Sequence, residues 1–338
     1  MTKKFNVGVV GATGMVGTEL VEALAARRFP VESIKLFASL NTAGEKVPFQ
    51  DDEVRVDPIT ADFGQGLEIV FFCAHPMISR DLAENAVKAG AVVIDSSRAF
   101  RDAPGVPMVA PELNPGDLAG VREGRRIVVN PSAAAVAAGL TVAPLHKRWS
   151  LKRVVAVTVY GSASSGRAGL AEHQNQTIGM FNQEELSCQL FGRQSAFNLF
   201  PRVGEFAGDE TEAEADLEAD LPRLLKAEIK VAATAAQAPY FCGIGSALNL
   251  EFEKEPSADE ARELLRHAPG VAVLDDPAND EYPDTVESMS RPEALVGRIR
   301  QDPSHARGLQ LWVSADNLRK GSAVNMVQIA EELIKDWK

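Results

Sequence analysis

The chain has 338 residues, 45% of them apolar and 24% charged, which is ordinary for a globular protein and long enough for two domains. A net charge of -12 argues against nucleic acid or an anionic membrane as the main partner, because phosphate binding needs a basic surface. No apolar run could span a bilayer or serve as a secretory signal, and three scattered cysteines lack metal-ligand spacing, so we expect a cytoplasmic protein without a metal.

The first part of the chain alternates apolar, strand-like runs with helix-like segments. The strand-like runs are residues 5–10, 33–39, 67–74, 91–97 and 126–130, and the helix-like segments are 15–27 and 79–89. Continuous apolar strands separated by amphipathic helices are typical of a parallel sheet covered on both faces. We therefore predict an α/β fold that begins with a Rossmann-like, doubly wound parallel sheet.

The turn after the first strand, "VGVVGATGMVG", places Gly11, Gly14 and Gly17 at intervals of three. Before a helix, such glycines permit a tight turn, a close pyrophosphate and close helix packing, so we predict dinucleotide binding over a merely structural turn. The second strand ends in "FASLNTAGEK", where Ser39, Asn41 and Thr42 are neutral and Lys46 is the nearest cation. The cofactor is therefore NADP or NAD, and the lack of a carboxylate here favours NADP.

Two further loops follow strand ends, where open α/β sheets bind ligands. In "DSSRAFRDAPG", Arg101 could clamp the phosphate or carboxylate of a small anionic ligand, or it could be a surface arginine paired with Asp102. In "VVNPSAAAVAAG", a strand turns at Asn130 and Pro131 into a helix whose first turn would favour an anionic nucleophile. Ala133 and the two alanines after it carry no reactive group.

From Leu151 onward, long strand-like segments predict a large mixed or antiparallel sheet, with a helix over "AGLAEHQNQTIGMFN". One face of such a sheet needs a cover, often another subunit, so we expect an α+β domain that forms a homodimer. The acidic stretch 204–222 is interpreted as a solvated loop leading into an exposed helix, with no role in the chemistry. The five histidines form no catalytic spacing, and the chain ends in an amphipathic helix.

Taken together, the motifs resemble the aspartate-semialdehyde dehydrogenase family of amino-acid biosynthesis along essentially the whole chain. The resemblance lies in "GATGMVG", "GAVVIDSSRAFR", "VPMVAPELN", "NPS", "FGRQSAFNLFP", "APYF" and "DNLRKGSAVNMVQIAE". It implies an NAD(P)-binding domain over residues 1–130, completed by a C-terminal helix at 318–338, and a substrate and dimerisation domain over 131–317. It also implies reductive dephosphorylation of aspartyl phosphate with NADPH through a cysteine thioester, with Arg101 as a phosphate ligand. The implied cofactor contacts are Thr13, Gly14, Met15, Val16, Asn41, Thr42, Ser164, Ser165 and Asn317.

Four positions depart from the family pattern in the substrate pocket. The family's nucleophilic cysteine aligns with Ala133, three residues after Asn130. The family's glutamine that positions this cysteine aligns with Gly161. The family's arginine that binds the substrate carboxylate aligns with Gln237. Its histidine that acts as general acid and base aligns with Ile244. The arginine that accepts the NADP 2′-phosphate is replaced by Asn41. No catalytic residue remains, which resembles the cysteine-less Usg branch of the family, although that branch can keep a histidine at the position of Ile244.

Two functions follow from this pattern. The first is an NAD(P)-binding homodimer without the family activity, a pseudoenzyme that could regulate a true family member. The second is an active NAD(P)-dependent oxidoreductase with altered chemistry at an aldehyde or oxo group. Its candidate nucleophile is Cys242, expected on the same face of a strand as Ile244, although a lone cysteine in an apolar strand is more often a small buried hydrophobe.

Overall fold

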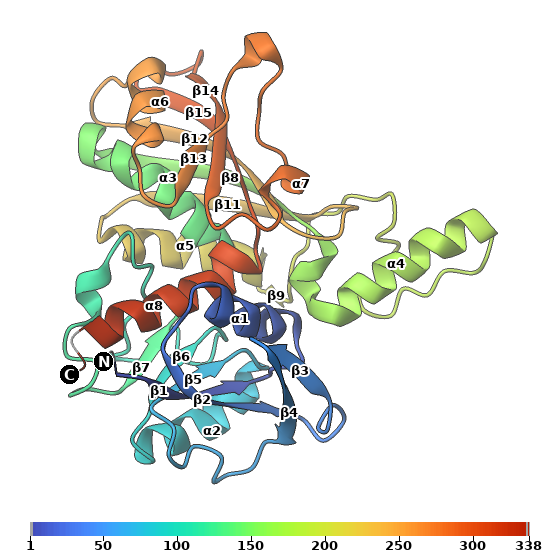
Figure 1. Cartoon of the computed structure of the whole chain (residues 1–338). Helices are drawn as coiled ribbons and strands as arrows, with labels where there is room; N and C mark the ends of the chain where they lie inside the picture. Colours follow the sequence, from blue (N-terminus) through green and yellow to red (C-terminus); the bar gives the residue numbers. More distant parts are fainter. Residues whose placement is uncertain (1–2, 336, 338) are drawn as a thin grey trace. The chain divides into compact units, whose positions relative to one another are not determined.

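The computed structural model describes residues 3–335 and 337 (Figure 1), and the chain forms two compact units. Unit 1 comprises Met1–Pro131 and Ser322–Lys338, and unit 2 comprises Ser132–Gly321. The final helix therefore belongs to the same unit as the first strand. Asp336 and Lys338, at the end of the predicted C-terminal helix, and Met1 and Thr2 lie outside the described residues.

Unit 1 is built on a seven-stranded sheet in the order β3-β4-β2-β1-β5-β6-β7. Its strands are β1 (Phe5–Val10), β2 (Val31–Ala38), β3 (Lys46–Phe49), β4 (Asp52–Pro58), β5 (Ile69–Phe72), β6 (Val92–Asp95) and β7 (Ile127–Val129). All neighbouring strands are parallel except β3 and β4, which form an antiparallel hairpin at one edge. The predicted Rossmann-like parallel sheet is confirmed.

Helices cover both faces of this sheet, as the doubly wound prediction requires. Helices α1 (Met15–Ala26) and α8 (Val324–Lys335) pack against each other on one face, and α2 (Pro76–Lys88) covers the other (Figure 1). Buried apolar side chains of α1 and α8 join those of the central strands in one core. The ring of Trp337 meets that of Phe5 edge to face with centroids 5.6 Å apart, so the end of the chain is tied to its first strand.

Unit 2 contains a six-stranded mixed sheet in the order β11-β8-β12-β15-β14-β13. Its strands are β8 (Leu151–Tyr160), β11 (Lys230–Gln237), β12 (Ile244–Phe252), β13 (Val271–Val273), β14 (Ala294–Gln301) and β15 (Gly308–Ala315). The three central pairings are antiparallel, whereas β11 with β8 and β13 with β14 are parallel. This confirms a large mixed sheet in the second part of the chain.

The helices of unit 2 leave one face of its sheet open. Helix α3 (Ala133–Trp149) packs on the four strands β8, β12, β14 and β15, α5 (Glu212–Leu225) packs on β11, and α6 (Ala258–Arg266) packs on β13 and β14. On the opposite face Val157 of β8 is 46% exposed. Helix α4 (Gly166–Asn182) and the loop after it extend away from the sheet (Figure 1).

Smaller elements complete the chain. They are the short strands β9 (Phe206–Ala207) and β10 (Glu210–Thr211), helix α7 (Thr285–Ser288), the 3-10 turns η1 (Pro115–Leu118), η2 (Ser162–Ser165) and η3 (Pro277–Asn279), and the π turn η4 (Arg319–Ala323).

Candidate functional site

The glycine turn between β1 and α1 has a backbone that no other residue type would fit. Gly11 has φ +84°, and a Cβ there would lie 2.6 Å from the carbonyl oxygen of Cys73. A Cβ on Gly17 would lie 2.1 Å from the carbonyl oxygen of Gly11. Both clashes are with backbone, which cannot move aside cheaply, so the turn depends on these two glycines.

The turn leaves the positive end of α1 without a competing anion. Gly14 is the N-cap residue, makes no side-chain capping bond, and is followed by no acidic residue in the first turn. The first N–H groups of a helix have no acceptor within the helix, and the helix dipole favours a negative charge beside them. Met15 and Val16 supply such N–H groups, so the glycine turn and the first turn of α1 together fit a pyrophosphate.

The turn after β2 lies against the glycine turn. The hydroxyl groups of Thr13 and Thr42 are 2.9 Å apart and share a hydrogen bond, and Asn41 beside them is exposed. Lys46 donates to Glu53 at 2.8 Å across the β3–β4 hairpin, which raises the pKa of Lys46. The cation expected near the adenine ribose thus already has a carboxylate partner.

At the carboxyl end of β6, Asp95 and Arg101 are both buried. The hydroxyl of Ser97 donates to Asp95 at 2.8 Å. Burial raises the pKa of Asp95, while the hydrogen bond from Ser97 and the charge of Arg101 lower it in part. Asp102 is exposed and Arg101 is buried, so Arg101 is not the surface arginine of the alternative expectation.

Asn130 is held within unit 1. Asn325 of α8 donates to the side-chain oxygen of Asn130 at 2.7 Å and to the carbonyl of Val109 at 3.1 Å. Asn130 in turn donates to the carbonyl of Pro131 at 2.9 Å. The side chain of Asn130 therefore has a fixed orientation.

In unit 2, Ala133 is the first residue of α3, and it is partly buried. A Cβ on Gly321 would lie 2.3 Å from the Cβ of Ala133, so the backbone of Gly321 packs directly on this alanine. The carboxylate of Asp220 on α5 accepts the N–H of Ser132 at 2.9 Å. An anion of the protein itself therefore lies at the positive end of α3.

Asp220 was missed in the sequence because it belongs to the acidic stretch interpreted as solvated. Helix α5 buries Leu217, Leu221 and Leu224, but it also buries Asp220 completely. The signal was available: Asp220 lies between apolar positions of the same helix, so it shares their inward face.

Gly161, which the resemblance aligns with a glutamine, has no room for a side chain. A Cβ there would lie 2.7 Å from the carbonyl oxygen of Phe241 and 2.9 Å from the backbone nitrogen of Cys242. Three hydrogen bonds hold the two segments together, because Gly161, Ser162 and Ala163 donate to the carbonyls of Gly243, Tyr240 and Phe241.

Gln237 and Ile244 lie beside this segment and are both buried. The amide of Gln237 donates to the carbonyl of Tyr160 at 2.9 Å, and its oxygen is 3.5 Å from the hydroxyl of Ser164. Ile244 begins β12 and pairs with Tyr160 of β8. The Gln237 amide is therefore bonded to backbone, and Ile244 presents an apolar side chain beside it.

The remaining unit 2 residues predicted to contact a cofactor adjoin the same segment. Ser164 donates to the carbonyl of Gly161 at 2.8 Å, and Ser165 is the N-cap residue of α4. The side-chain oxygen of Asn317 accepts the N–H of Gly243 at 2.9 Å. Unit 2 therefore brings Ser164, Asn317, Gly161, Gln237 and Ile244 into one cluster, whereas the glycine turn, Arg101 and Asn130 belong to unit 1.

Cys242 does not share a strand with Ile244, so that expectation was wrong. Strand β12 begins at Ile244, and Gly243 between them has φ +92°, which breaks the alternation of an extended strand. Burial and the charge of Asp316 raise the pKa of the half-buried Cys242 thiol. Both features disfavour a thiolate nucleophile at Cys242.

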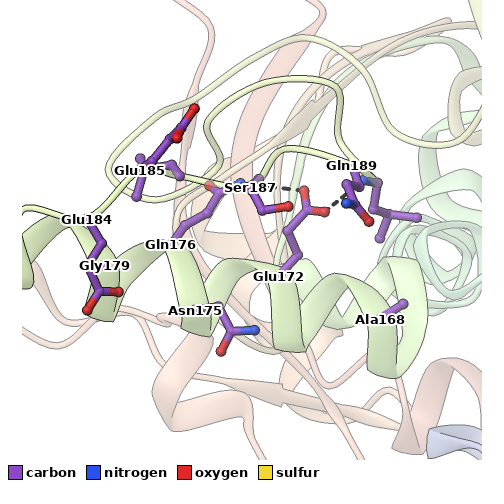
Figure 2. A pocket seen from close by; sticks show the side chains of 11 residues that line it. Ala168, Glu172, Asn175, Gln176, Gly179, Glu184, Glu185, Ser187 and Gln189 are labelled. Carbon is purple, nitrogen blue, oxygen red and sulfur yellow. Dashed lines mark hydrogen bonds between the residues drawn. The ribbon is translucent and has the colours of Figure 1, made fainter.

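A hollow of unit 2 lies away from this cluster, between α4 and the loop after it (Figure 2). It has a volume of about 550 Å³, and Glu172, Glu184 and Glu185 line it with amide side chains. Glu172 accepts the N–H groups of Leu190 and Phe191 at 2.7 and 3.1 Å, so it holds the loop. No residue of the predicted site lines the hollow.

Within residues 3–335 and 337, no cluster of three or more histidine, cysteine or acidic side chains could hold a metal ion. Over the same described residues, no helix is both long and apolar enough to cross a membrane.

Comparisons with known proteins match the two parts of the chain to two different domains. Residues 6–121 match the family model described as the semialdehyde dehydrogenase NAD binding domain, and residues 142–320 match its dimerisation domain. The chain is 38% identical over 336 residues to aspartate-semialdehyde dehydrogenase of Aquifex aeolicus, and the alignment covers 98% of each chain. It is 36% identical over 338 residues to the enzyme of Rickettsia bellii, with full coverage of both.

Among solved structures, aspartate semialdehyde dehydrogenase II of Vibrio cholerae, complexed with ASA, superposes with a TM-score of 0.95 at 31% identity. The superposition covers 100% of both chains.

Proposed function

Because the chain belongs to the aspartate-semialdehyde dehydrogenase family, we propose that it is a homodimer that binds a nicotinamide dinucleotide but lacks the family's reductive dephosphorylation activity. The observation that carries this proposal is the alanine at position 133, the first residue of α3. The resemblance aligns this position with the nucleophilic cysteine of the family. A methyl group cannot attack a carbonyl carbon, so no thioester forms for phosphate to attack.

Three other positions of unit 2 support the loss of the whole reaction centre. The backbone at Gly161 excludes the family's glutamine, Gln237 is bonded to backbone, and Ile244 offers no proton. Because these residues would act as a unit with the nucleophile, restoring one of them leaves the others missing. This combination fits a cysteine-less branch of the family.

The glycine turn supports retained cofactor binding. Gly11, Gly14 and Gly17 with the first N–H groups of α1 would hold the pyrophosphate, and Thr13, Asn41 and Thr42 would lie toward the adenine ribose. Ser164, Ser165 and Asn317 of unit 2 complete the proposed cofactor contacts. When bound, a nicotinamide cofactor supplies hydride transfer. The end of β2 has no carboxylate, which favours NADP, but Lys46 is paired with Glu53, so we propose weak discrimination between NADP and NAD.

Unit 2 supplies a surface for the second copy of the chain. Large apolar side chains are exposed on α4 and on the loop after it, among them Phe181 at 75%. Phe181 meets Phe197 edge to face with centroids 5.9 Å apart, and Ile178, Leu190 and Leu199 are also exposed. An exposed apolar group of this size marks an interaction surface, and it lies within the residues that match a dimerisation domain.

Calorimetry with NADPH and NADH on the purified chain tests the cofactor half of the proposal, and sedimentation equilibrium tests the dimer. The matched control is Gly17→Ala, whose Cβ would lie 2.1 Å from the carbonyl of Gly11 and would distort the glycine turn without touching unit 2. We expect measurable binding that weakens at least about tenfold in the variant. If neither dinucleotide binds at millimolar concentration, the cofactor half is refuted.

A further inference from the structure

A pocket of unit 1 lies between η1, with the loop after it, and the end of α8, and nothing in the proposed function uses it. Its volume is about 380 Å³, near the lower end of the range of about 300–1,000 Å³ for small-molecule sites, so it suits one small molecule. We propose that this pocket binds a free α-amino acid with an apolar side chain.

The pocket is separate from the sites already described. The ring of Trp337 in its wall packs on Phe5, the first residue of β1, whereas the glycine turn follows Val10, the last residue of that strand. A strand of this length spans about 17–20 Å, so the pocket and the glycine turn lie toward opposite ends of β1. All residues that line the pocket also lie outside residues 142–320, which match the dimerisation domain, and so outside the surface proposed for the second copy.

The apolar surface of the pocket is held in place. The ring of Trp337 is buried, meets that of Phe5 edge to face, and has the guanidinium of Arg122 over it, 4.2 Å from the ring centre. Leu333 of α8 is buried in the core of unit 1, and Leu118 of η1 packs against that core. Ordered apolar side chains offer a ligand contact area without a large loss of side-chain freedom on binding.

Asn114 holds the η1 side of the pocket. Its side-chain oxygen accepts the N–H of Ala110 at 3.0 Å, and its side-chain nitrogen donates to the carbonyl of Met108 at 2.8 Å and to the carboxylate of Asp117 at 2.9 Å. Helix α8 packs on η1 from the other side. Both walls are therefore preorganised for a ligand.

The charged side chains of the pocket carry both signs. Lys335 donates to Glu332, so these two charges already compensate each other. Arg122 and Glu123 are exposed, and neither forms an ion pair with another residue in the part of the chain that the structure describes. A guanidinium can donate paired N–H groups to a carboxylate, and a carboxylate accepts from an ammonium group. An α-amino acid carries its carboxylate and ammonium on one carbon, so it matches both charges while its side chain lies on the apolar surface.

The test is calorimetric titration of the full-length protein with L-leucine and with two analogues that each lack one of its charges. We expect saturable binding of L-leucine. The analogue 4-methylpentanoate lacks the ammonium group and 3-methylbutylamine lacks the carboxylate, and each should bind at least about tenfold more weakly than L-leucine.

Two variants assign the charges to their residues. Arg122→Gln and Glu123→Gln should each weaken binding of L-leucine about tenfold. Arg122→Gln should also abolish the preference for L-leucine over 3-methylbutylamine, and Glu123→Gln the preference over 4-methylpentanoate, because each variant lacks the partner of the missing group. The matched controls, Arg80→Gln on α2 and Glu22→Gln on α1, change exposed residues of unit 1 outside the pocket and should leave the affinity unchanged.

Three results would overturn the proposal. One is the absence of saturable binding of L-leucine at millimolar concentration. Another is binding that Arg122→Gln and Glu123→Gln both leave unaltered, which would place the amino acid elsewhere on the protein. The third is an equal loss of affinity for L-leucine and both analogues in each variant, which would assign the two residues a structural role only.

Discussion

Replacing Gly161 by glutamine, the residue that our proposal places there in active relatives, should destabilise the protein and leave it inactive. The first side-chain atom already collides with backbone, because a Cβ at this position would lie 2.7 Å from the carbonyl oxygen of Phe241. Since that oxygen also accepts the N–H of Ala163 at 2.8 Å, the segment cannot withdraw without losing hydrogen bonds.

The size of the effect follows from the contacts. Forcing additional atoms into a packed site costs about 1–3 kcal/mol, and loss of one of the three backbone hydrogen bonds adds about 1 kcal/mol. The free energy of unfolding should therefore fall by about 2–4 kcal/mol. For a unit of this size, that corresponds to a decrease in Tm of about 5–12 °C.

Scanning calorimetry measures the decrease in Tm directly, and two matched variants serve as comparisons. Gly161→Ala should show most of the loss, because its Cβ is the colliding atom. Gly116→Gln, in a 3-10 turn of unit 1 where a Cβ would meet no atom within 4 Å, should change Tm by less than about 2 °C. If Gly161→Gln melts within about 2 °C of the native protein, the site has room for the missing side chain and the reasoning is refuted.

Three other outcomes are expected. Ala133→Cys should not restore phosphate-dependent reduction of NADP, because Gly161, Gln237 and Ile244 are unchanged; turnover by this single variant would show that the centre is otherwise intact. Cys242 should stay unmodified by iodoacetamide at neutral pH, because burial and Asp316 raise its thiol pKa; rapid alkylation seen by mass spectrometry would revive it as a nucleophile. Burial lowers the pKa of His173, so the folded protein binds the proton less readily than the unfolded chain, and stability should fall as pH drops below about 6.5. The difference in Tm between pH 7.5 and 5.5 should shrink in His173→Gln, and an unchanged difference would assign it to other groups.

Regular patterns made much of unit 1 predictable from the sequence. The continuous apolar strands and the glycine spacing identified the sheet and the turn before α1. The β3–β4 hairpin was missed because β3 has only 4 residues and β4, DEVRVDP, is rich in charged residues, so neither strand forms an apolar run. It matters for function because it pairs Lys46 with Glu53.

The features of unit 2 that were missed depend on tertiary contacts. The collision at Gly161 and the packing of Gly321 on Ala133 involve segments far apart in the chain. The position of Cys242 relative to Ile244 changed because Gly243 takes a positive φ, which an alternating pattern does not reveal. The positive φ of Arg298 in β14 was unpredictable for the same reason, since an arginine does not signal a left-handed backbone.

The central claim, an emptied reaction centre on an intact fold, is tested most directly by one assay. Protein purified from a host that lacks its own aspartate-semialdehyde dehydrogenase is mixed with aspartate semialdehyde, phosphate and NADP, and NADPH formation is followed at ~340 nm, the nicotinamide absorbance. We predict a turnover below about 10⁻³ per second, at least about 10⁴-fold under an ordinary enzyme. Turnover of about 1 per second that scales with protein concentration would contradict the account.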